Sequence, residues 1–247
     1  MKKTLTNGIA LAVAGLSLNV FAQYPLTLDF EGSDPLAGWT TVGETTDIFD
    51  DSGNNVLNVR DTTGAGANTT YYALPTPITS TGSVSFDVYG LNGADTTNVA
   101  FWLNNGTSDS NRQVGFGYNP TNTNFEWYSF DGTSAAKFDQ VGTFAANTWY
   151  NVTMDFDVIE NTFQMSVQGG DFITPTQLTW NSGDDTFAFR NGTASEISHL
   201  YITAFSSTNN GNDGIRVDNI TVIPEPSSLL LLVSALGACA LIFRRRR

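Results

Sequence analysis

Few residues in this chain have the types and spacing that catalysis requires. His199 is the single histidine among 247 residues, so a histidine-based metal site or a Ser-His-Asp arrangement would depend on it alone. Asp155 and Asp157 come closest to a carboxylate pair, but they alternate with apolar residues, as the solvent face of a strand does. A retaining glycosidase needs two carboxylates about 5–5.5 Å apart, and the spacing Glu-x-Asp-x-x-Glu does not occur. We predict no catalytic residues and no enzymatic activity.

Aromatic side chains could instead stack on the apolar face of a sugar ring, because flat, rigid rings lose little conformational entropy on contact. In the run Phe125–Phe130, alternation places Trp127 and Tyr128 on opposite faces of one strand, so that one can be buried while the other stays open. We predict Trp127, Tyr128 and Trp102 as candidate ligand-binding residues. Core packing is the alternative role for each of them and for Trp180.

The overall composition excludes two classes of protein. The chain has 11 Lys and Arg against 24 Asp and Glu, a formal net charge of -13, which disfavours nucleic acid as a partner. Hydrophobic residues make up 40% and aromatic residues 12%, which is too apolar for a disordered chain. We therefore predict a folded, acidic protein that binds no nucleic acid.

Both ends of the chain carry targeting features. Lys2 and Lys3 precede the apolar stretch Ile9–Val20, and Ala22 supplies a small residue for cleavage, so we predict a signal peptide over residues 1–22. At the other end, Leu229–Phe243 contains no charged residue and Arg244, Arg245, Arg246 and Arg247 follow it. We predict one transmembrane helix there, with this arginine cluster in the cytoplasm.

The C-terminal segment resembles a known sorting signal. The motif Pro224, Glu225 and Pro226, the apolar span and the arginine cluster occur in the order found in PEP-CTERM proteins. The resemblance covers about the last 25 residues. It implies a Gram-negative bacterium, transient anchoring in the inner membrane, processing by an exosortase-type membrane transpeptidase, and delivery to the cell surface or the extracellular space. A plain membrane anchor is the alternative.

The region between these ends has the pattern of an all-β domain. Residues 23–223 contain five basic residues against 23 acidic ones, a charge near -18. Tyr150–Val158 and Phe163–Val167 alternate apolar and polar residues and predict a hairpin. The oxygen-rich run Asp47–Asn54 predicts an Asx-rich turn. Further strands are predicted at Leu26–Phe30, Val84–Tyr89, Val99–Leu103, Val114–Tyr118, Phe125–Phe130, Phe187–Phe189, Leu200–Phe205 and Ile215–Val222.

Many short strands and no helical stripe predict an antiparallel β-sandwich, a jelly roll. We divide the chain into a signal peptide (1–22), this exported domain (23–223) and a sorting segment (224–247). Leu28–Gly32, Asn147–Val152 and Ile215–Ile220 resemble segments of concanavalin-type, laminin-G-type and carbohydrate-binding-module jelly rolls. That resemblance implies that acidic residues on the first and last strands, Glu31 and Asp218, hold a structural Ca²⁺.

Together these features predict an exported cell-surface or extracellular-matrix protein that binds carbohydrate, with the cell's own exopolysaccharide as a candidate partner. Two alternatives remain open. A purely structural surface or biofilm protein would have no ligand site, and a polysaccharide-active enzyme would have carboxylates that converge in a cleft. An exposed aromatic pair above polar side chains on one sheet is the feature that favours binding.

Overall fold

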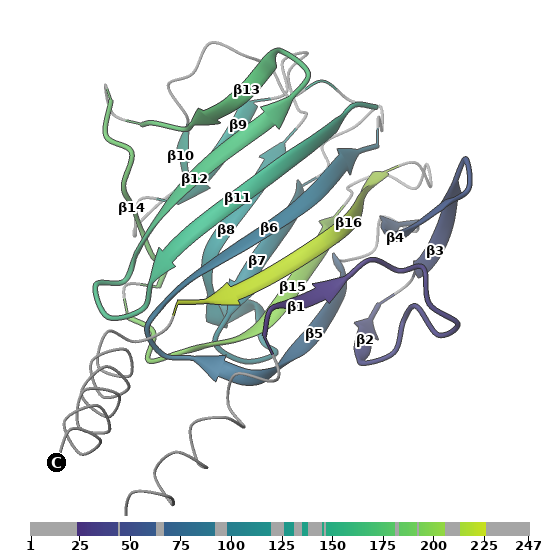
Figure 1. Cartoon of the computed structure of the whole chain (residues 1–247), viewed down its shortest axis with the longest axis horizontal. Coiled ribbons are helices and arrows are strands. Elements are labelled where there is room, and N and C mark those ends of the chain that lie inside the picture. Colours follow the sequence, from purple (N-terminus) through teal and green to yellow (C-terminus); the bar gives the residue numbers. More distant parts are fainter. Residues whose placement is uncertain are drawn as a thin grey trace, which may run out of the picture.

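The computed structural model describes residues 24–43, 45–62, 67–91, 98–119, 126–130, 135–137, 145, 147–180, 183–191, 193–205 and 213–225. In these residues the chain forms two antiparallel β-sheets that pack face to face (Figure 1). The predicted all-β antiparallel sandwich is thereby confirmed. The predicted signal peptide and the predicted transmembrane helix lie outside the described residues. No helix within the described ranges is long and apolar enough to span a membrane.

Among the described residues, sheet A has nine strands. Its main path runs in the order β13-β12-β11-β6-β16-β4-β3, with β1 paired to β16 and β14 paired to β12. Their bounds are Phe172–Gln177 (β13), Thr162–Gly169 (β12), Trp149–Asp157 (β11), Thr81–Gly90 (β6), Asp213–Pro224 (β16), Asn54–Asp61 (β4), Thr45–Asp51 (β3), Leu26–Leu28 (β1) and Phe187–Ala188 (β14). The sheet therefore mixes strands from both ends of the domain.

Sheet B has, in the described part of the chain, seven strands in the order β10-β9-β8-β7-β15-β5-β2. A short 3₁₀ helix, η2, precedes β8. The bounds are Ala135–Lys137 (β10), Glu126–Phe130 (β9), Arg112–Asn119 (β8), Asn98–Asn104 (β7), Ile197–Phe205 (β15), Ala67–Ile78 (β5), Trp39–Val42 (β2) and Asp109–Asn111 (η2).

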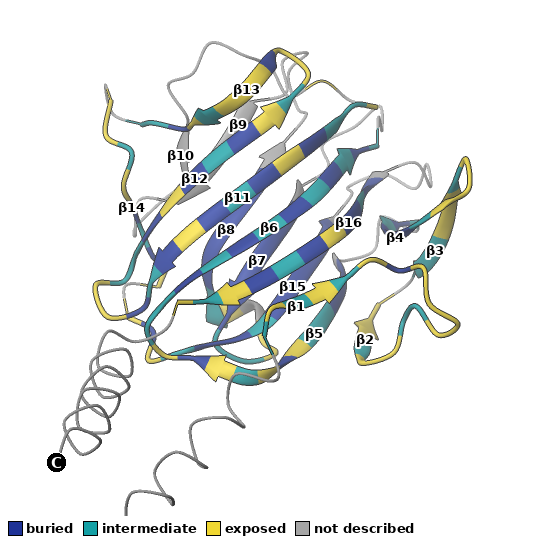
Figure 2. Cartoon of the chain, viewed as in Figure 1, coloured by how far each residue is buried: buried dark blue, intermediate teal, exposed yellow. Residues whose placement is uncertain are grey.

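The predicted hairpin is confirmed, and its alternation sets the two faces of sheet A. β11 pairs with β12, with Met154 opposite Met165. Along β11 and β6 every second residue is buried, and the residues between them are exposed or half-buried (Figure 2). Each strand thus gives one row of side chains to the core and one to the outer face of the sheet.

The core lies between the two sheets and is rich in aromatic rings. Phe86 of β6 stacks on Phe101 of β7, with 3.9 Å between ring centroids and 13° between ring planes. Both side chains are fully buried. Since β6 belongs to sheet A and β7 to sheet B, this ring pair joins the two layers at the centre of the sandwich.

The strands between Trp39 and Ile78 were not predicted from the sequence. The predicted Asx-rich turn at Asp47–Asn54 is wrong for most of its length, because Asp47–Asp51 belongs to β3 and only Ser52 and Gly53 form the turn. In β4, residues 56–59 are all buried, so no period of two is visible there.

β16 changes partners along its length. Residues 213–217 pair with β4, and residues 220–222 pair with β1. On its other side β16 pairs with β6 at both ends, with a register shift between Asp218 and Thr221. Asn219, inside this shift, has a φ of +50°. Asp218 therefore lies where the neighbour of β16 changes from β4 to β1.

Candidate functional site

Three aromatic rings and one arginine meet on the outer face of sheet A, and we name Phe49, Tyr89, Trp149 and Arg216 the aromatic–arginine cluster. The Arg216 Cζ atom lies 3.5 Å from the centroid of the Phe49 ring and 5.2 Å from that of Tyr89. The ring centroids of Tyr89 and Trp149 are 5.2 Å apart. All four side chains are half-buried or exposed. Such cation–π contacts hold the guanidinium in place.

Strand register brings three members of the cluster into one row. Tyr89 of β6 lies opposite Arg216 of β16 on one side and opposite Trp149 of β11 on the other. Side chains at directly opposite positions share a face and touch. The row therefore follows from backbone pairing alone.

Phe49 reaches this row because the β3–β4 hairpin bends toward the outer face of the sheet. Trp149 Nε1 donates a hydrogen bond of 3.1 Å to Asp51 Oδ2, at the end of β3. Three strands separate β3 from β11 in the sheet order. On a flat sheet those strands would lie about 19 Å apart, at about 4.8 Å per strand, which is too far for two side chains. Sheet A must therefore curl strongly between β11 and β3.

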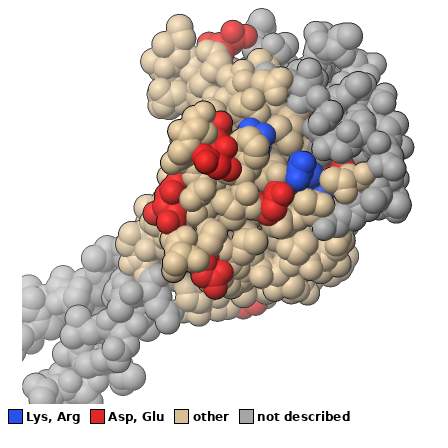
Figure 3. Space-filling model, turned by 90° about the vertical axis from the view of Figure 1, so that its right-hand side faces the viewer, with Lys and Arg blue, Asp and Glu red and all other residues tan. Residues whose placement is uncertain are grey.

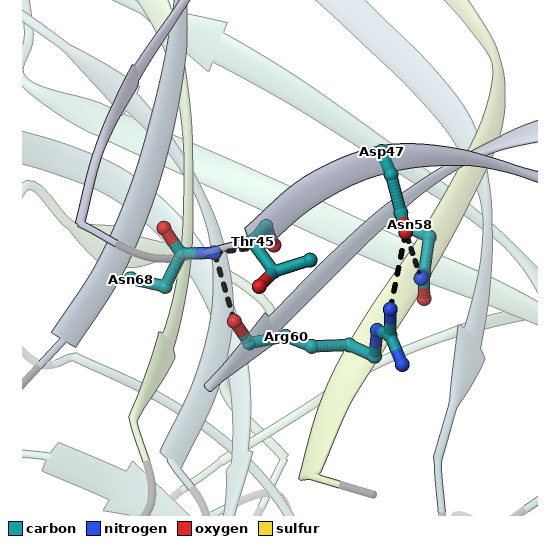
Figure 4. A network of polar contacts seen from close by, with 5 residues as sticks. All are labelled: Thr45, Asp47, Asn58, Arg60 and Asn68. Carbon is teal, nitrogen blue, oxygen red and sulfur yellow. Dashed lines mark hydrogen bonds and ion pairs between the residues drawn. The ribbon is translucent and has the colours of Figure 1, made fainter. Parts of the chain in front are cut away.

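A polar network holds the β3–β4 hairpin in this position (Figure 4). Asp47 of β3 accepts hydrogen bonds from Asn58 Nδ2 (2.6 Å) and from Arg60 (3.1 Å), both on β4. Asn68, on β5 of sheet B, donates to the carbonyl oxygens of Thr45 (2.5 Å) and Arg60 (2.8 Å). The strand that carries Phe49 and Asp51 is thus fixed to its neighbour and to the opposite sheet.

Carboxylates and amides form a second row beside the cluster. Asp87 of β6 accepts from Asn151 Nδ2 and from Asn219 Nδ2, each at 2.8 Å. Asp218 lies opposite Asp87 and accepts from Asn54 Nδ2 (2.9 Å) and from the Asn219 backbone N–H (2.8 Å). Burial raises the pKa of Asp218, and the negative charge of Asp87 adds to the increase.

The two residues predicted to bind calcium lie in the same region. Asp218 accepts from Asn54, and Glu31 accepts from the backbone N–H (2.7 Å) and the side chain (3.3 Å) of Asn55. These amide donors would have to turn away before a cation could bind between the two carboxylates. Within the described ranges no three His, Cys, Asp or Glu residues are grouped to hold a metal. Calcium at Glu31 and Asp218 stays a prediction.

Arg216 is available to a ligand. No carboxylate among the described residues forms an ion pair with it, whereas Arg60 is paired with Asp47. The Nε atom of Arg216 is buried and has no hydrogen-bond partner among the described residues. The guanidinium is therefore held by ring stacking, and its terminal N–H groups can donate to an added acceptor.

Trp102 lies on the other sheet and is not an open platform. It belongs to β7, is 2% exposed, and has the Cζ atoms of Arg112 and Arg190 each 5.3 Å from its ring centroid. Gly115 lies opposite it on β8, and a Cβ at that glycine would come within 1.9 Å of the Trp102 ring. The ring is thus enclosed on the outer face of sheet B.

The other predicted residues are placed as follows. Trp127 and Tyr128 lie in β9, opposite Tyr118 and Gly117; their side chains lie outside the described part, so their ligand role stays a prediction. Trp180 packs against the core.

The sorting motif begins at the end of the described domain. Pro224 ends β16, and the Glu225 N–H donates to the carbonyl of Thr81 at 3.1 Å. Pro226 and the arginine cluster at 244–247 lie outside the described residues.

Two of the three residues considered for catalysis, Asp157 and His199, have side-chain hydrogen bonds within the fold. The Asp157 carboxylate accepts hydrogen bonds from the backbone N–H groups of Ile159 (2.8 Å) and Glu160 (3.0 Å). These bonds stabilise the turn between β11 and β12. Asp155 is exposed on the outer face of sheet A. His199 Nδ1 lies 2.9 Å from Ser198 Oγ, and burial lowers the pKa of His199.

The four residues of the aromatic–arginine cluster were not predicted from the sequence as site residues. A signal existed for two of them, because Trp149 and Arg216 lie in segments that carry the jelly-roll resemblance, Asn147–Val152 and Ile215–Ile220. No pattern in the sequence indicates Phe49, which the curl of sheet A brings to the cluster.

Comparison with solved structures identifies the type of sandwich. The chain is similar to a module termed CBM2 in the evolved Dit of Lactobacillus casei BL23 phage J-1, at 12% identity and a TM-score of 0.53, over 81% of this chain and 96% of that one. It is also similar to the legume lectin-like domain from Entamoeba histolytica (9% identity, TM-score 0.51, 81% and 97%) and to a Lotus tetragonolobus seed lectin (10%, 0.50, 82% and 100%).

These likenesses show the fold, an antiparallel two-sheet sandwich of the legume-lectin type. They extend over four fifths of the chain, so the whole described domain, and not one hairpin, has this architecture. No protein-family model and no curated protein sequence matches the chain.

Proposed function

We propose that this domain binds carbohydrate through the aromatic–arginine cluster. The observation that carries the proposal is the pair of partly exposed rings, Tyr89 and Trp149, directly beside the hydrogen-bonding residues Asp87, Asn151 and Arg216. Ring faces match the C–H faces of a sugar, and carboxylates, amides and the guanidinium match its hydroxyl groups. The lectin-type fold supports the same conclusion.

The cluster is also held in one conformation before a ligand arrives. Arg216 is stacked on Phe49, Trp149 is hydrogen-bonded to Asp51, and Asp47 anchors the hairpin from which Phe49 projects. A surface that is ordered in advance loses less conformational entropy on binding, so a larger part of each contact contributes to affinity.

Replacing Trp149 by alanine is expected to weaken glycan binding roughly 30-fold, because a central aromatic residue typically contributes about 2 kcal/mol to binding. The measurement is affinity electrophoresis through gels that contain soluble galactan, mannan, glucan or the exopolysaccharide of the producing strain. Ile173→Ala is the matched control, since Ile173 is an exposed apolar residue on the edge strand β13.

Thermal unfolding of each variant separates loss of a contact from loss of the fold. Trp149→Phe keeps an aromatic ring, although a smaller one, and removes the N–H that donates to Asp51, so it should bind more tightly than Trp149→Ala. If neither the wild type nor any variant is retarded by any polysaccharide, the proposal fails, and a structural surface protein becomes the better account.

We further propose that the chain is exported and sorted through its C-terminal segment, with an exosortase-type transpeptidase as the processing partner. The support lies in the sequence: the N-terminal signal, the motif at Pro224–Pro226 and the arginine cluster at 244–247. The protein would pass through the inner membrane, stay anchored transiently and then reach the cell surface or medium.

Replacing Pro224, Glu225 and Pro226 together by alanine is expected to leave the full-length protein in the membrane fraction, because the processing enzyme loses its recognition motif. The measurement is immunoblotting of membrane and medium fractions from the producing bacterium. Deleting Arg244–Arg247 serves as a second variant. Identical distribution and size of wild type and alanine variant would contradict sorting through this motif.

A further inference from the structure

The outer face of sheet A continues beyond the cluster as a strip of polar side chains without rings or basic groups. The strip takes two residues from each of β6, β11 and β12, all half-buried or exposed. They are Ser83, Ser85, Thr153, Asp155, Gln164 and Ser166. Strand pairing forms them into two rows, Ser85–Thr153–Ser166 and Ser83–Asp155–Gln164.

The strip is continuous with the cluster along the strands. On β11 the outward-facing residues after Trp149 are Asn151, Thr153, Asp155 and Asp157. At about 3.3 Å rise per residue, Thr153 lies about 13 Å and Asp155 about 20 Å from Trp149. A single sugar stacked on Trp149 cannot reach Asp155, whereas a chain of sugars can. The short Ser and Thr side chains leave the surface low enough for such a chain to lie along it.

The charge of this face selects against acidic polymers. β6, β11 and β12 contain no Lys or Arg, and Asp87, Asp155 and Asp157 face outward from them. The nearest described arginine in this face is Arg216, inside the cluster. Figure 3, which shows the adjoining side with β3 and β4, also has more acidic than basic groups among its described residues. Arg216 could pair with one carboxylate of a uronic acid polymer, but the carboxylates that lie over the strip would be repelled by these aspartates.

A neutral chain meets complementary groups instead. Sugar hydroxyl groups can donate to Asp155 and accept from Gln164, and the Ser and Thr hydroxyl groups can do either. Bound water can complete contacts that the short side chains do not make directly.

From these observations we infer that the ligand of the cluster is a neutral polysaccharide chain that extends from the Trp149 ring over the polar strip. This inference rests on the proposed carbohydrate binding and adds two properties to it. The ligand carries no carboxylate, and several consecutive sugar units contribute to affinity.

The test compares neutral and acidic polymers, and then short and long neutral oligosaccharides. The probes are galactan against polygalacturonate and mannan against alginate, in gels that contain EDTA so that divalent cations cannot bridge acidic groups. The neutral polymer that retards the protein is then used as di- to hexasaccharides in calorimetry. We expect retardation by neutral polymers only, and at least tenfold tighter binding of the hexasaccharide than of the disaccharide.

Thr153→Arg is the variant for the strip, and Thr174→Arg is its matched control, because Thr174 is an exposed strand residue on β13. Thr153→Arg should reduce hexasaccharide affinity to that of the disaccharide and leave disaccharide affinity unchanged, whereas Thr174→Arg should change neither. Equal retardation by polygalacturonate and galactan, or equal affinity for di- and hexasaccharide, overturns this inference.

The two proposals fail in different ways. If Trp149→Ala binds every polymer as well as the wild type does, the cluster is not the binding site and the proposed function is wrong. If Trp149→Ala abolishes binding but Thr153→Arg has no effect on any oligosaccharide, the cluster binds carbohydrate and only the extended neutral ligand is wrong.

Discussion

Replacement of Phe86 by alanine is expected to lower the free energy of unfolding by about 4 kcal/mol, within the usual range for truncating a buried phenylalanine. The ring is fully buried, stacks on Phe101 at 3.9 Å and lies 6.5 Å from Phe116. Because Phe86 comes from sheet A and the other two rings from sheet B, the cavity would open between the layers. Urea denaturation followed by tryptophan fluorescence measures the change.

Ile173→Ala is the control for this variant, because Ile173 is 86% exposed. Its free energy of unfolding should change by no more than about 0.5 kcal/mol. A loss below about 1.5 kcal/mol for Phe86→Ala would mean that the sheets close over the cavity, and that the stacked pair does not determine their separation.

Replacement of Gly115 by alanine is expected to lower the free energy of unfolding by about 3 kcal/mol, at the upper end for overpacking. The added methyl group would lie 1.9 Å from Cε3 of the Trp102 ring. The ring cannot move away easily, because Arg112 and Arg190 both stack on it and only 2% of Trp102 is exposed. The ring or β8 must shift to accept the methyl group.

The matched control is Gly32→Ala. Gly32 has nothing within 4 Å of the position of an added Cβ and does not have a positive φ, so alanine should be neutral or stabilise by less than about 1 kcal/mol. Equal unfolding midpoints for Gly115→Ala and Gly32→Ala would show that the Trp102 ring moves to make room for the methyl group without a loss of stability.

Alternation in the sequence was sufficient to predict the fold class and the hairpin of β11 and β12. It failed between Trp39 and Ile78 for physical reasons. β4 is buried on both faces near Val56–Val59, so its sequence does not alternate. β5 contains Pro75 and Pro77, and prolines ordinarily argue against a strand unless it lies near an edge.

The candidate site was less predictable than the fold. The alternation of Asn151 with Val152 indicates which residues of β11 face outward, and so places Trp149 on the wet face. Nothing local indicates that Tyr89 lies opposite Trp149, because this pairing joins residues 60 positions apart. Trp102 was selected for its residue type, but its burial depends on contacts with Arg112 and Arg190 from distant segments.

The central position of β16 determines how the domain responds to mechanical load. This strand ends at Pro224, and hydrogen bonds hold it to β6 on one side and to β4 and β1 on the other. Tension on the chain beyond Glu225 acts along the strand, whereas the ladder bonds lie across it. Many bonds must then break together in shear, not one after another as in unzipping, so the sandwich should resist being pulled open from its C-terminal side.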